Sequence, residues 1–526
     1  MTDDRKQTLI KSGMIIVVAT FVGRLFGFVR EIFISHQYGT GDQAEAYFIA
    51  ITIPTILIAV LPGALNSVCT PLFAEYKEKG DSKGLQKLFN TITTLMLLGS
   101  FLLSVLGGIF ASQIVSVLAP GFSGEVRELT VELVQLMVPA ITLVGLISIF
   151  WSYLNAQQHF LMPSLGPLVA SLVVILSIFV LVPAYGIQGL TVGTVIGFFF
   201  QGIIMYPALR KREIQFGFAL DLRNPAVKRF FVLMVPIVIG MSINQLNVVV
   251  DRMLGSGLAD GKFAAYIYAT KIYQLPIGIF VGAITLPLFP VLSQYASQNN
   301  IDKLITTMWG GIKMLAFIML PVTAVLMIVG EPIVRLLFER GEFTATSTVE
   351  TNWALIFLAI GFFPYAVRDL LTRVFYSLQD TRTPVIINTL TITLNIIFSI
   401  ILVRYIDQGG LGLGMALGGV INFVIMLYVI RRKLGIVVDK NSVHQMIKII
   451  LATGIMSVVL WLTKDIFISM ESVTESGSLE FIHRMLELIP PLLLAAVAYL
   501  LAAYLLRIDA LQFIRRKKTP MHSHEK

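Results

Sequence analysis

The chain has 526 residues and a formal net charge of +9, and 56% of its residues are hydrophobic whereas only 13% are charged. Soluble domains contain about 25% charged residues, so this composition excludes an ordinary soluble protein. The single cysteine, Cys69, excludes an internal disulfide and a cysteine-based metal cluster. Basic residues collect in loops on one side of a membrane, so the positive charge does not predict a nucleic-acid partner.

Apolar segments of about 20 residues or more follow one another along the chain, a length that suits a hydrocarbon layer of roughly 30 Å. The strands of a membrane β-barrel would be about 10 residues long and strictly alternating, so we predict an all-α polytopic membrane protein with 14 transmembrane helices. The expected spans lie near residues 11–36, 46–75, 88–117, 129–155, 162–184, 188–208, 229–251, 263–295, 304–337, 351–376, 384–405, 411–430, 446–464 and 486–506.

The first span follows basic residues, as a signal peptide would. No small-residue cleavage pattern follows it, and its apolar run continues through Arg24 to Arg30, so we expect it to be retained.

Lysine and arginine gather before span 1, in the loops after spans 2, 6 and 12, and in the tail. These basic residues are Arg5, Lys6 and Lys11 before span 1; Lys77, Lys79, Lys83 and Lys87; Arg210, Lys211, Arg212, Arg223, Lys228 and Arg229; Arg431, Arg432, Lys433 and Lys440; and Arg515 to Lys518 in the tail. The loop HQYGTGDQAE on the opposite side has none. This asymmetry predicts that both termini are cytoplasmic.

The sequence contains an internal repeat. With a shift of 219 residues, AYFIAITIPTILIAVLPGALNSVCTPLFAEY, ending at Tyr76, aligns with AYIYATKIYQLPIGIFVGAITLPLFPVLSQY, ending at Tyr295. With a shift of 221, Gly189, Leu190, Gly193 and Gly197 align with Gly410, Leu411, Gly414 and Gly418. Spans 1–6 and 7–12 are therefore two copies of one six-helix unit, and both enter from the same side.

The repeat predicts two pseudo-symmetric lobes around a central cavity, because transporters built from repeats bind their substrate between the halves. The expected regions are an N-lobe 1–212, a cytoplasmic linker 213–228, a C-lobe 229–433, two further spans in 434–510 and a basic cytoplasmic tail 511–526. The last two spans look like lipid-facing additions that could form a groove. The alternative is that duplication only enlarged the bundle.

Charged residues inside the spans are the candidate site, since an ionisable group at membrane depth usually faces a cavity or a partner. Arg24 is expected roughly 20 Å into span 1, and Glu31, seven residues on, would share its face. Arg24 either pairs with Glu31 or Glu45 to lock two helices, or binds an anionic substrate group, which guanidinium can hold bidentately. Arg30 could instead reach the outer interface.

Further cations lie in the second half. Lys271 falls in span 8, where its repeat mate is Thr52, and Arg252, beside Asp251, closes span 7. Span 10 carries Arg368, Asp369 and Arg373. Asp369 and Arg373 are four residues apart, so a local salt bridge is the alternative to a substrate contact. The net positive cavity predicts an anionic substrate.

We do not expect an enzyme. The chain has no P-loop, no HExxH and no GxSxG motif. The glycine-rich stretch GLGLGMALGG, residues 410–419, lies in a membrane span, so it indicates close helix packing rather than a phosphate-binding loop. We expect no metal or cofactor.

Four motifs carry a family resemblance. GRLFGFVREIFIS with AEAYFIAITIP, then LLFERGEFTA at 336–345 and FYSLQDTRTP at 375–384, resemble the MurJ (MviN) family of the multidrug/oligosaccharidyl-lipid/polysaccharide exporter superfamily. The resemblance runs from about residue 7 to 510. It implies a flippase that moves lipid II, the undecaprenyl-pyrophosphate-linked peptidoglycan precursor, across the bacterial cytoplasmic membrane. It also implies two six-helix lobes around a cationic cavity, with two C-terminal helices forming a groove for the lipid tail.

The resemblance also assigns residues. Arg24 and Arg30 match essential arginines of span 1, and Glu45 stands where the family usually has aspartate. Ile58 and Lys271 depart from the family, which has arginine at both places. Some members bind sodium in the second lobe, and the candidate ligand here is Asp380, with a cap or turn role as the alternative.

The expected function is therefore lipid II flipping by alternating access. Arg24, Arg30 and Lys271 would bind the head group, with Glu31, Glu45, Arg252, Arg368 and Arg373 as further candidates. Sodium, protons or the membrane potential would drive the cycle. The alternatives are another lipid-linked oligosaccharide (teichoic acid, capsule or exopolysaccharide) or a non-transporting scaffold for cell-wall synthases. Expected partners are the lipid substrate, membrane lipids and cell-wall synthases, with the chain a monomer.

Overall fold

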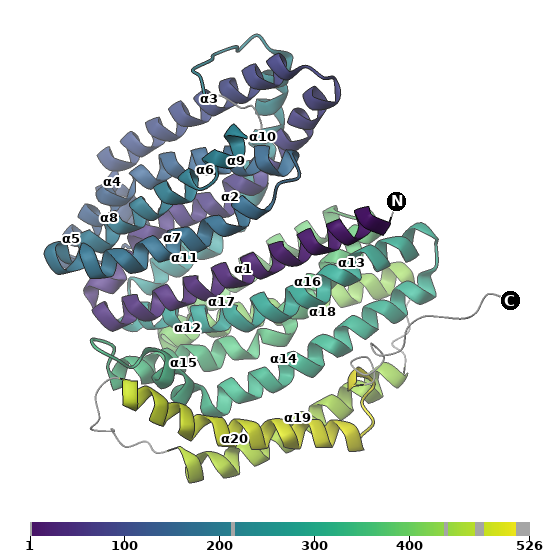
Figure 1. Ribbon diagram of the computed structural model, residues 1–526. Helices are drawn as coiled ribbons and strands as arrows, with labels where there is room; N and C mark the ends of the chain where they lie inside the picture. The colour runs from purple at the N-terminus through teal and green to yellow at the C-terminus, as the bar shows by residue number, and fades with distance from the viewer. Residues whose placement is uncertain (1–2, 212–215, 436–439, 469–477, 512–526) are drawn as a thin grey trace. The chain divides into compact units, whose positions relative to one another are not determined.

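The structure is a computed structural model that describes residues 3–211, 216–435, 440–468 and 478–511. Within these ranges, side chains are described from residue 18 onward except at 440 and 478–480. The described residues are helical throughout, with short turns and no strand. By packing they form two compact units. Unit 1 comprises residues 1–264 together with 340–343, and unit 2 comprises 265–339 and the residues from 344 onward. Figure 1 shows the helices of both units.

Most helices of unit 1 are long and apolar. They are α1 (Asp3–Tyr38), α2 (Asp42–Glu78), α3 (Ser82–Ile109), α4 (Ala111–Leu118), α5 (Gly124–Met137), α6 (Pro139–Ala156), α7 (Leu161–Val180), α8 (Val182–Ile203), α9 (Tyr206–Arg210), α10 (Pro225–Ile243) and α11 (Leu246–Gly255). The core of this unit gathers buried side chains of α2, α3, α6, α8 and α10.

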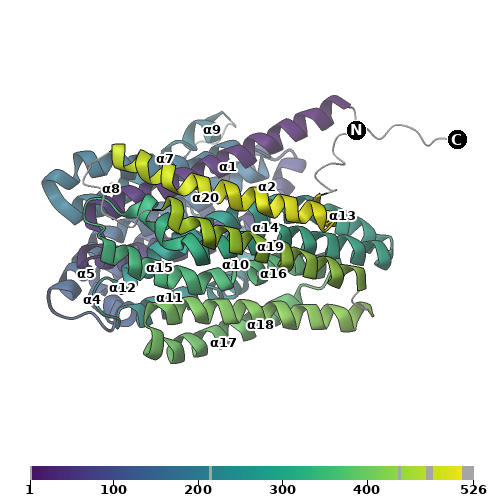
Figure 2. The same ribbon diagram turned by 90° about the horizontal axis from the view of Figure 1, so that it is seen from below.

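Unit 2 continues the chain with the remaining helices. They are α12 (Lys262–Pro276), the π-helix η1 (Ile277–Val281), α13 (Gly282–Ser297), α14 (Ile301–Phe338), α15 (Ala345–Ile360), α16 (Phe362–Ser377), α17 (Arg382–Ile406), α18 (Gln408–Leu434), α19 (Lys440–Phe467) and α20 (Ser478–Leu505). In the view of Figure 2, α17 and α18 run side by side.

Twelve described helices are long and apolar enough to cross a membrane, and α15 with α16, bent by 43°, makes thirteen. α1 lies outside this count and carries Arg24, Arg30 and Glu31 in its apolar run. With α1 the number equals the fourteen spans predicted. Several expected spans are interrupted in the structure, among them 88–117 at Phe110, 129–155 at Val138, 351–376 at Gly361, and 229–251 between α10 and α11 at Asn244 and Gln245.

The backbone confirms the internal repeat. Left-handed residues recur at the predicted shifts: Gly80 and Asn299, Gln158 and Gln379, Gly186 and Asp407. The helix caps recur as well, since Asp81 accepts a hydrogen bond from the Gly84 N–H and Asn300 accepts one from Lys303. The break at Phe110 between α3 and α4 corresponds to the kink at Val329 inside α14.

The repeated glycines bring helices into close contact, as predicted. A Cβ atom on Gly193 would lie 2.0 Å from the Ser177 Oγ atom, and one on Gly414 would lie 2.3 Å from the Ser399 Oγ atom. α7 therefore packs against α8 in unit 1, and α17 packs against α18 in unit 2, with only glycine possible at the crossing.

Packing divides the chain at a different place from the predicted lobe boundary. α10 packs against α2 and α3, so residues 225–264 belong to unit 1 rather than to the second unit. The lobe boundaries read from the repeat stay a prediction, and the tail 512–526 and residues 212–215 of the linker lie outside the described residues.

The two helices beyond the repeat, α19 and α20, pack within unit 2. α19 and α20 contact α14, and the Tyr499 hydroxyl donates a 2.7 Å hydrogen bond to the Phe317 carbonyl. Their outer faces are apolar and exposed, for example at Val458 and Val497. This agrees with lipid-facing additions, while the groove for a lipid tail stays a prediction.

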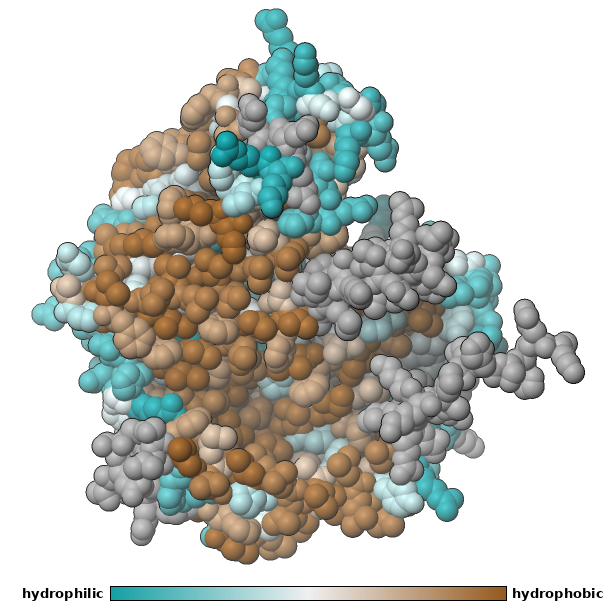
Figure 3. Space-filling view, in the orientation of Figure 1, coloured by the Kyte–Doolittle hydropathy of each residue, from teal (hydrophilic) through white to brown (hydrophobic). Residues whose placement is uncertain are grey.

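The surface of unit 1 is apolar along its helices. α3 exposes Leu98, Phe101, Leu102 and Leu103, each more than half accessible. Figure 3 shows such apolar side chains gathered in the middle of the face and hydrophilic ones at the helix ends. This distribution is the one that a hydrocarbon layer requires.

Candidate functional site

α1 lies against α7 through small residues. A Cβ atom on Gly23 would lie 3.7 Å from the Leu168 backbone nitrogen, and one on Gly27 would lie 3.9 Å from the Ser171 Oγ atom. This close packing fixes α1 along the length that carries the candidate arginines. Arg24, one residue after Gly23, is exposed, and among the described residues it makes no hydrogen bond or ion pair.

Arg30 and Glu31 form an ion pair on consecutive residues. The Arg30 Nη2 atom lies 2.5 Å from the Glu31 Oε1 atom, and the two side chains are 21% and 3% exposed. Arg30 therefore turns toward a protein partner instead of reaching outward alone. The alternative in which Arg24 pairs with Glu31 is not found, because Glu31 pairs with its neighbour Arg30.

Glu45 holds the start of α12. Its Oε1 atom accepts hydrogen bonds from the backbone N–H groups of Phe263 and Ala264, at 3.1 and 3.2 Å. A carboxylate at a helix N-terminus satisfies orphan N–H groups and is favoured by the helix dipole. The proposed pairing of Arg24 with Glu45 is therefore not found either. What the structure shows for Glu45 is a capping contact.

Arg252, in the second copy of the repeat, contacts a residue of the first copy. Its Nε atom donates a 2.9 Å hydrogen bond to the Thr52 Oγ1 atom, and its guanidinium lies 5.2 Å from the centre of the Phe263 ring. The repeat had singled out Thr52 only as the mate of Lys271. Its hydroxyl is a partner that the sequence did not predict, because no local pattern links two residues 200 positions apart.

Lys271 lies on α12, half-buried, six residues before η1. A π-helical turn inside a longer helix is uncommon and often marks a functional site. The structure therefore places the Lys271 cation close to an irregular stretch of span 8. It makes contacts within the protein, so it is not an isolated charge.

The charges of α16 are partly neutralised. The Asp369 Oδ2 atom accepts from the Arg373 Nε atom at 3.1 Å and from the Thr285 Oγ1 atom at 2.8 Å. The alternative expected from the four-residue spacing, a local salt bridge, is therefore present. The Arg368 guanidinium stacks over the Tyr365 ring at 3.9 Å, an arrangement that stabilises a cation.

Asp380 has both carboxylate oxygens engaged. The Lys433 Nζ atom lies 2.6 Å from Oδ2, which also accepts the Thr383 hydroxyl at 2.7 Å, and the Thr383 N–H donates to Oδ1 at 3.0 Å. Partial burial acts to raise its pKa, but the lysine and the two hydrogen bonds outweigh it and lower the pKa of Asp380 to about 2. This is the turn role named as the alternative to a sodium ligand, and the sodium role stays a prediction.

The candidates thus fall into two groups. Arg30, Glu45, Arg252, Arg373 and Asp380 each have a protein partner in the structure. Arg24 has none among the described residues, which makes it the candidate most open to a ligand. No group of three or more histidine, cysteine or acidic side chains in the described parts of the chain could hold a metal ion.

Known proteins are similar to this chain in sequence and in fold. The family model of the lipid II flippase MurJ matches residues 34–476. A probable lipid II flippase MurJ of Synechocystis sp. is 31% identical over 470 residues, which are 85% of this chain and 86% of that protein.

Solved structures agree. The lipid II flippase MurJ in an inward closed conformation superposes with a TM-score of 0.80 at 25% identity, over 95% of this chain and all of that one. An inward-facing multidrug resistance MATE family transporter of the MOP superfamily gives a TM-score of 0.66 at 17% identity, over 80% of this chain and 98% of that one, which shows a shared fold. The resemblance seen in the sequence motifs is confirmed, and the chain belongs to the lipid II flippase MurJ family.

Proposed function

We propose that the protein flips lipid II from the inner to the outer leaflet of the cytoplasmic membrane by alternating access. The observation that carries this function is Arg24, a cation inside an apolar helix that has no protein partner among the described residues, in a chain of the MurJ family. A guanidinium at membrane depth without a partner is costly, and the pyrophosphate of lipid II supplies the anion that stabilises it.

The residues divide the work by their contacts. Arg24 binds the pyrophosphate, and Arg30 and Lys271 add positive charge. Arg252 and Glu45 position α2, α11 and the start of α12, because Arg252 on α11 contacts Thr52 on α2 and Glu45 on α2 contacts the start of α12. Both termini are cytoplasmic in this proposal. The driving force is the membrane potential or a sodium or proton gradient, since one charge moved across 100 mV is worth about 2.3 kcal/mol.

The test is complementation in a strain depleted of its own flippase. The strain expresses the wild type, Arg24→Ala, Arg24→Lys or Arg432→Ala, and lipid II at the outer surface is labelled. Arg24→Ala is expected to abolish flipping, and Arg24→Lys to retain a fraction because lysine keeps the charge without the bidentate geometry. Arg432→Ala, an exposed arginine in the last turn of α18, is the control.

Two results would overturn the proposal. Normal surface labelling by Arg24→Ala, at matched expression, would remove the site. Normal growth by every variant without any flipping would favour the scaffold role instead.

Ile58 supports a second candidate cargo. It packs against the apolar core of unit 1, at a position where the MurJ family usually has arginine. A site that lacks one cation suits a different head group, such as that of another isoprenoid-linked oligosaccharide. The lipid-linked intermediate that accumulates inside on depletion distinguishes the two cargoes.

A further inference from the structure

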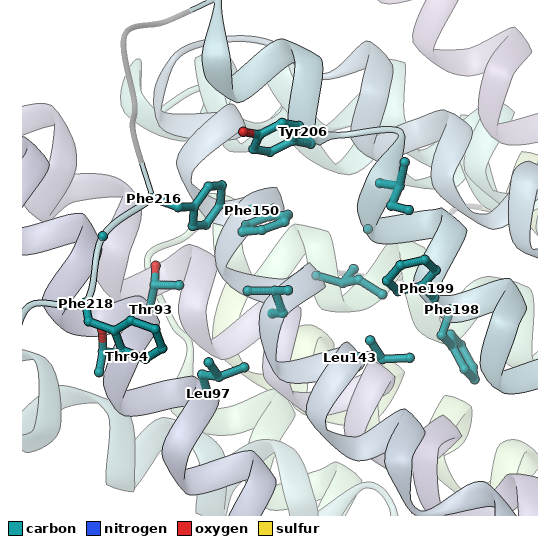
Figure 4. Close-up of a pocket in the computed structure, with 15 residues that line it drawn as sticks. Thr93, Thr94, Leu97, Leu143, Phe150, Phe198, Phe199, Tyr206, Phe216 and Phe218 are labelled. Carbon is teal, nitrogen blue, oxygen red and sulfur yellow. The ribbon is translucent and has the colours of Figure 1, made fainter.

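Unit 1 contains a pocket far along the chain from the candidate arginines. It encloses about 400 Å³ between α3, α6, α8 and the segment 216–218. This aromatic pocket, shown in Figure 4, is lined among others by Thr93, Leu97, Leu143, Phe150, Phe199 and Phe216. Pockets that hold small ligands have volumes of about 300–1,000 Å³, so it has room for part of a lipid.

The pocket is preformed and opens to the outside of the bundle. The Phe216 ring packs on Phe150 at 5.2 Å and on Tyr206 at 5.6 Å between ring centres, which fixes the wall formed by the loop. Phe199 is 50% exposed and Phe218 is 86% exposed. A ligand would therefore enter sideways from the surrounding hydrocarbon.

Two buried polar groups at one end of the pocket lack partners. The Asn90 Oδ1 atom and the Thr93 Oγ1 atom make no hydrogen bond in the described structure, although both residues are more than nine-tenths buried. Thr93 lines the pocket, and Asn90 is one turn earlier on α3, with its Nδ2 atom 3.2 Å from the Cβ position of the lining residue Gly217. A buried polar atom without a partner is costly, so these two atoms point to a ligand with hydrogen-bonding groups.

The same end is positively charged. Tyr206 lines the pocket, and Arg210 and Lys211 follow one turn later, both exposed. In the described part of the segment 206–228, four residues are basic and Asp221 is the one acidic residue. Asp221 forms an ion pair with Lys87, with 2.6 Å between the Asp221 Oδ2 and Lys87 Nζ atoms, so it does not neutralise Arg210 or Lys211. The opposite end, at Leu97 and Leu143, is apolar. The pocket therefore has one polar end and one apolar end, as a site for an amphiphilic ligand requires.

We propose that the aromatic pocket binds a membrane glycerophospholipid with an anionic, hydroxyl-bearing head group. Its acyl chain lies against Leu97 and Leu143, its head-group hydroxyls reach Asn90 and Thr93, and its phosphate lies near Arg210 and Lys211. An isoprenoid tail fits less well, because a pure hydrocarbon leaves both polar atoms unsatisfied. This site is separate from the one proposed for lipid II.

The test is native mass spectrometry of the full-length protein titrated with phosphatidylglycerol, phosphatidylcholine or undecaprenyl phosphate. Phosphatidylglycerol is expected to bind more tightly than phosphatidylcholine with the same chains. Thr93→Val, which keeps the shape but removes the hydroxyl, is expected to weaken binding by about threefold to tenfold. Leu97→Trp, which fills the apolar end, is expected to abolish binding.

Matched controls lie on the same helices. Leu98→Trp changes a neighbouring, 52% exposed side chain, and Thr191→Val removes a buried hydroxyl that already bonds to the Ile187 carbonyl; both are expected to bind like the wild type. Equal binding of the two phospholipids, or displacement by equimolar undecaprenyl phosphate, would overturn the proposal. So would unchanged binding in Leu97→Trp or, if that variant does not fold, in Thr93→Val.

Discussion

The two copies of the repeat share a backbone but not a charge pattern. Both place left-handed residues, helix caps and close helix crossings at equivalent positions. Yet Thr52 in the first copy corresponds to Lys271 in the second, and His159 corresponds to Asp380. Glycines are fixed by close packing and caps by hydrogen bonds to the helix N-terminus, whereas other side chains of the two copies can diverge. The comparison teaches that scaffold and chemistry follow separate constraints in this chain.

Among the variants that distinguish the two copies, the largest effect is expected from removing the charge that only the second copy has. Lys271→Ala is expected to slow flipping roughly 10-fold or more, since a hydrogen bond to a charged group contributes about 1.5–3 kcal/mol. Lys271→Arg is expected to retain flipping. Surface labelling of lipid II, at matched expression, measures both.

The swap variant sharpens the same comparison. Thr52→Lys combined with Lys271→Ala moves the cation to the first copy. It is expected not to restore flipping, because position 52 contacts Arg252 and the two cations repel. Full restoration would show that the copies are interchangeable.

A smaller effect is expected where the copies agree. Gly193→Ala and Gly414→Ala each force a Cβ atom into a serine, so both are expected to lower the free energy of unfolding by about 1–3 kcal/mol. The unfolding midpoint in detergent measures this. Gly99→Ala, which has nothing within 4 Å, is the control and is expected to be neutral or stabilising. If only one of the pair were affected, the two crossings would not be equivalent.

The smallest effect concerns Asp380, which has no counterpart carboxylate in the first copy. Its pKa is lower in the folded protein, about 2, than its ordinary value of 3.8, so its contribution is present above about pH 4 and is lost as the pH falls toward 2. Asp380→Asn is expected to cost about 1 kcal/mol at pH 7, since the 45% exposed Lys433 is screened by solvent.

The measurement is the difference in unfolding midpoint between wild type and Asp380→Asn at pH 7 and at pH 3. The difference is expected to shrink at the lower pH. Asp465→Asn, at a 79% exposed carboxylate, is expected to show no difference at either pH. A constant difference for Asp380→Asn would exclude the ion pair as its cause.

Much of the fold could be predicted from the sequence. The lengths of the apolar segments predicted the spans, and the internal sequence similarity predicted the repeat that the backbone confirms. The break at Asn244 and the packing of α10 with unit 1 were not predictable, because hydropathy reports how apolar a segment is and not which helix it contacts. Arg252 reaches Thr52 across 200 positions of sequence, and no local pattern encodes that pairing.

The candidate site was predicted by residue but not by partner. Arg24 was named because a charge in an apolar run needs a reason, and the structure leaves it open. The spacing offered Glu31 as a partner for Arg24, but Glu31 pairs with Arg30, since adjacent long side chains can meet when both bend toward the same buried space. Spacing rules describe regular helix faces and miss such pairs.

The short loop that joins α14 to α15 has a consequence for synthesis. Its residues 340–343 belong to unit 1, where the Glu342 N–H donates a 2.9 Å hydrogen bond to the His36 carbonyl. A Cβ atom on Gly39 would lie 2.2 Å from the Glu342 carbonyl oxygen, and one on Gly341 would lie 2.2 Å from the His36 carbonyl oxygen. Unit 1 is thus incomplete when residue 264 leaves the ribosome. About eighty more residues must follow, which takes roughly 4–16 s at 5–20 residues per second. The end of α1 is therefore translated well before its contact partner, the loop 340–343, has been synthesised.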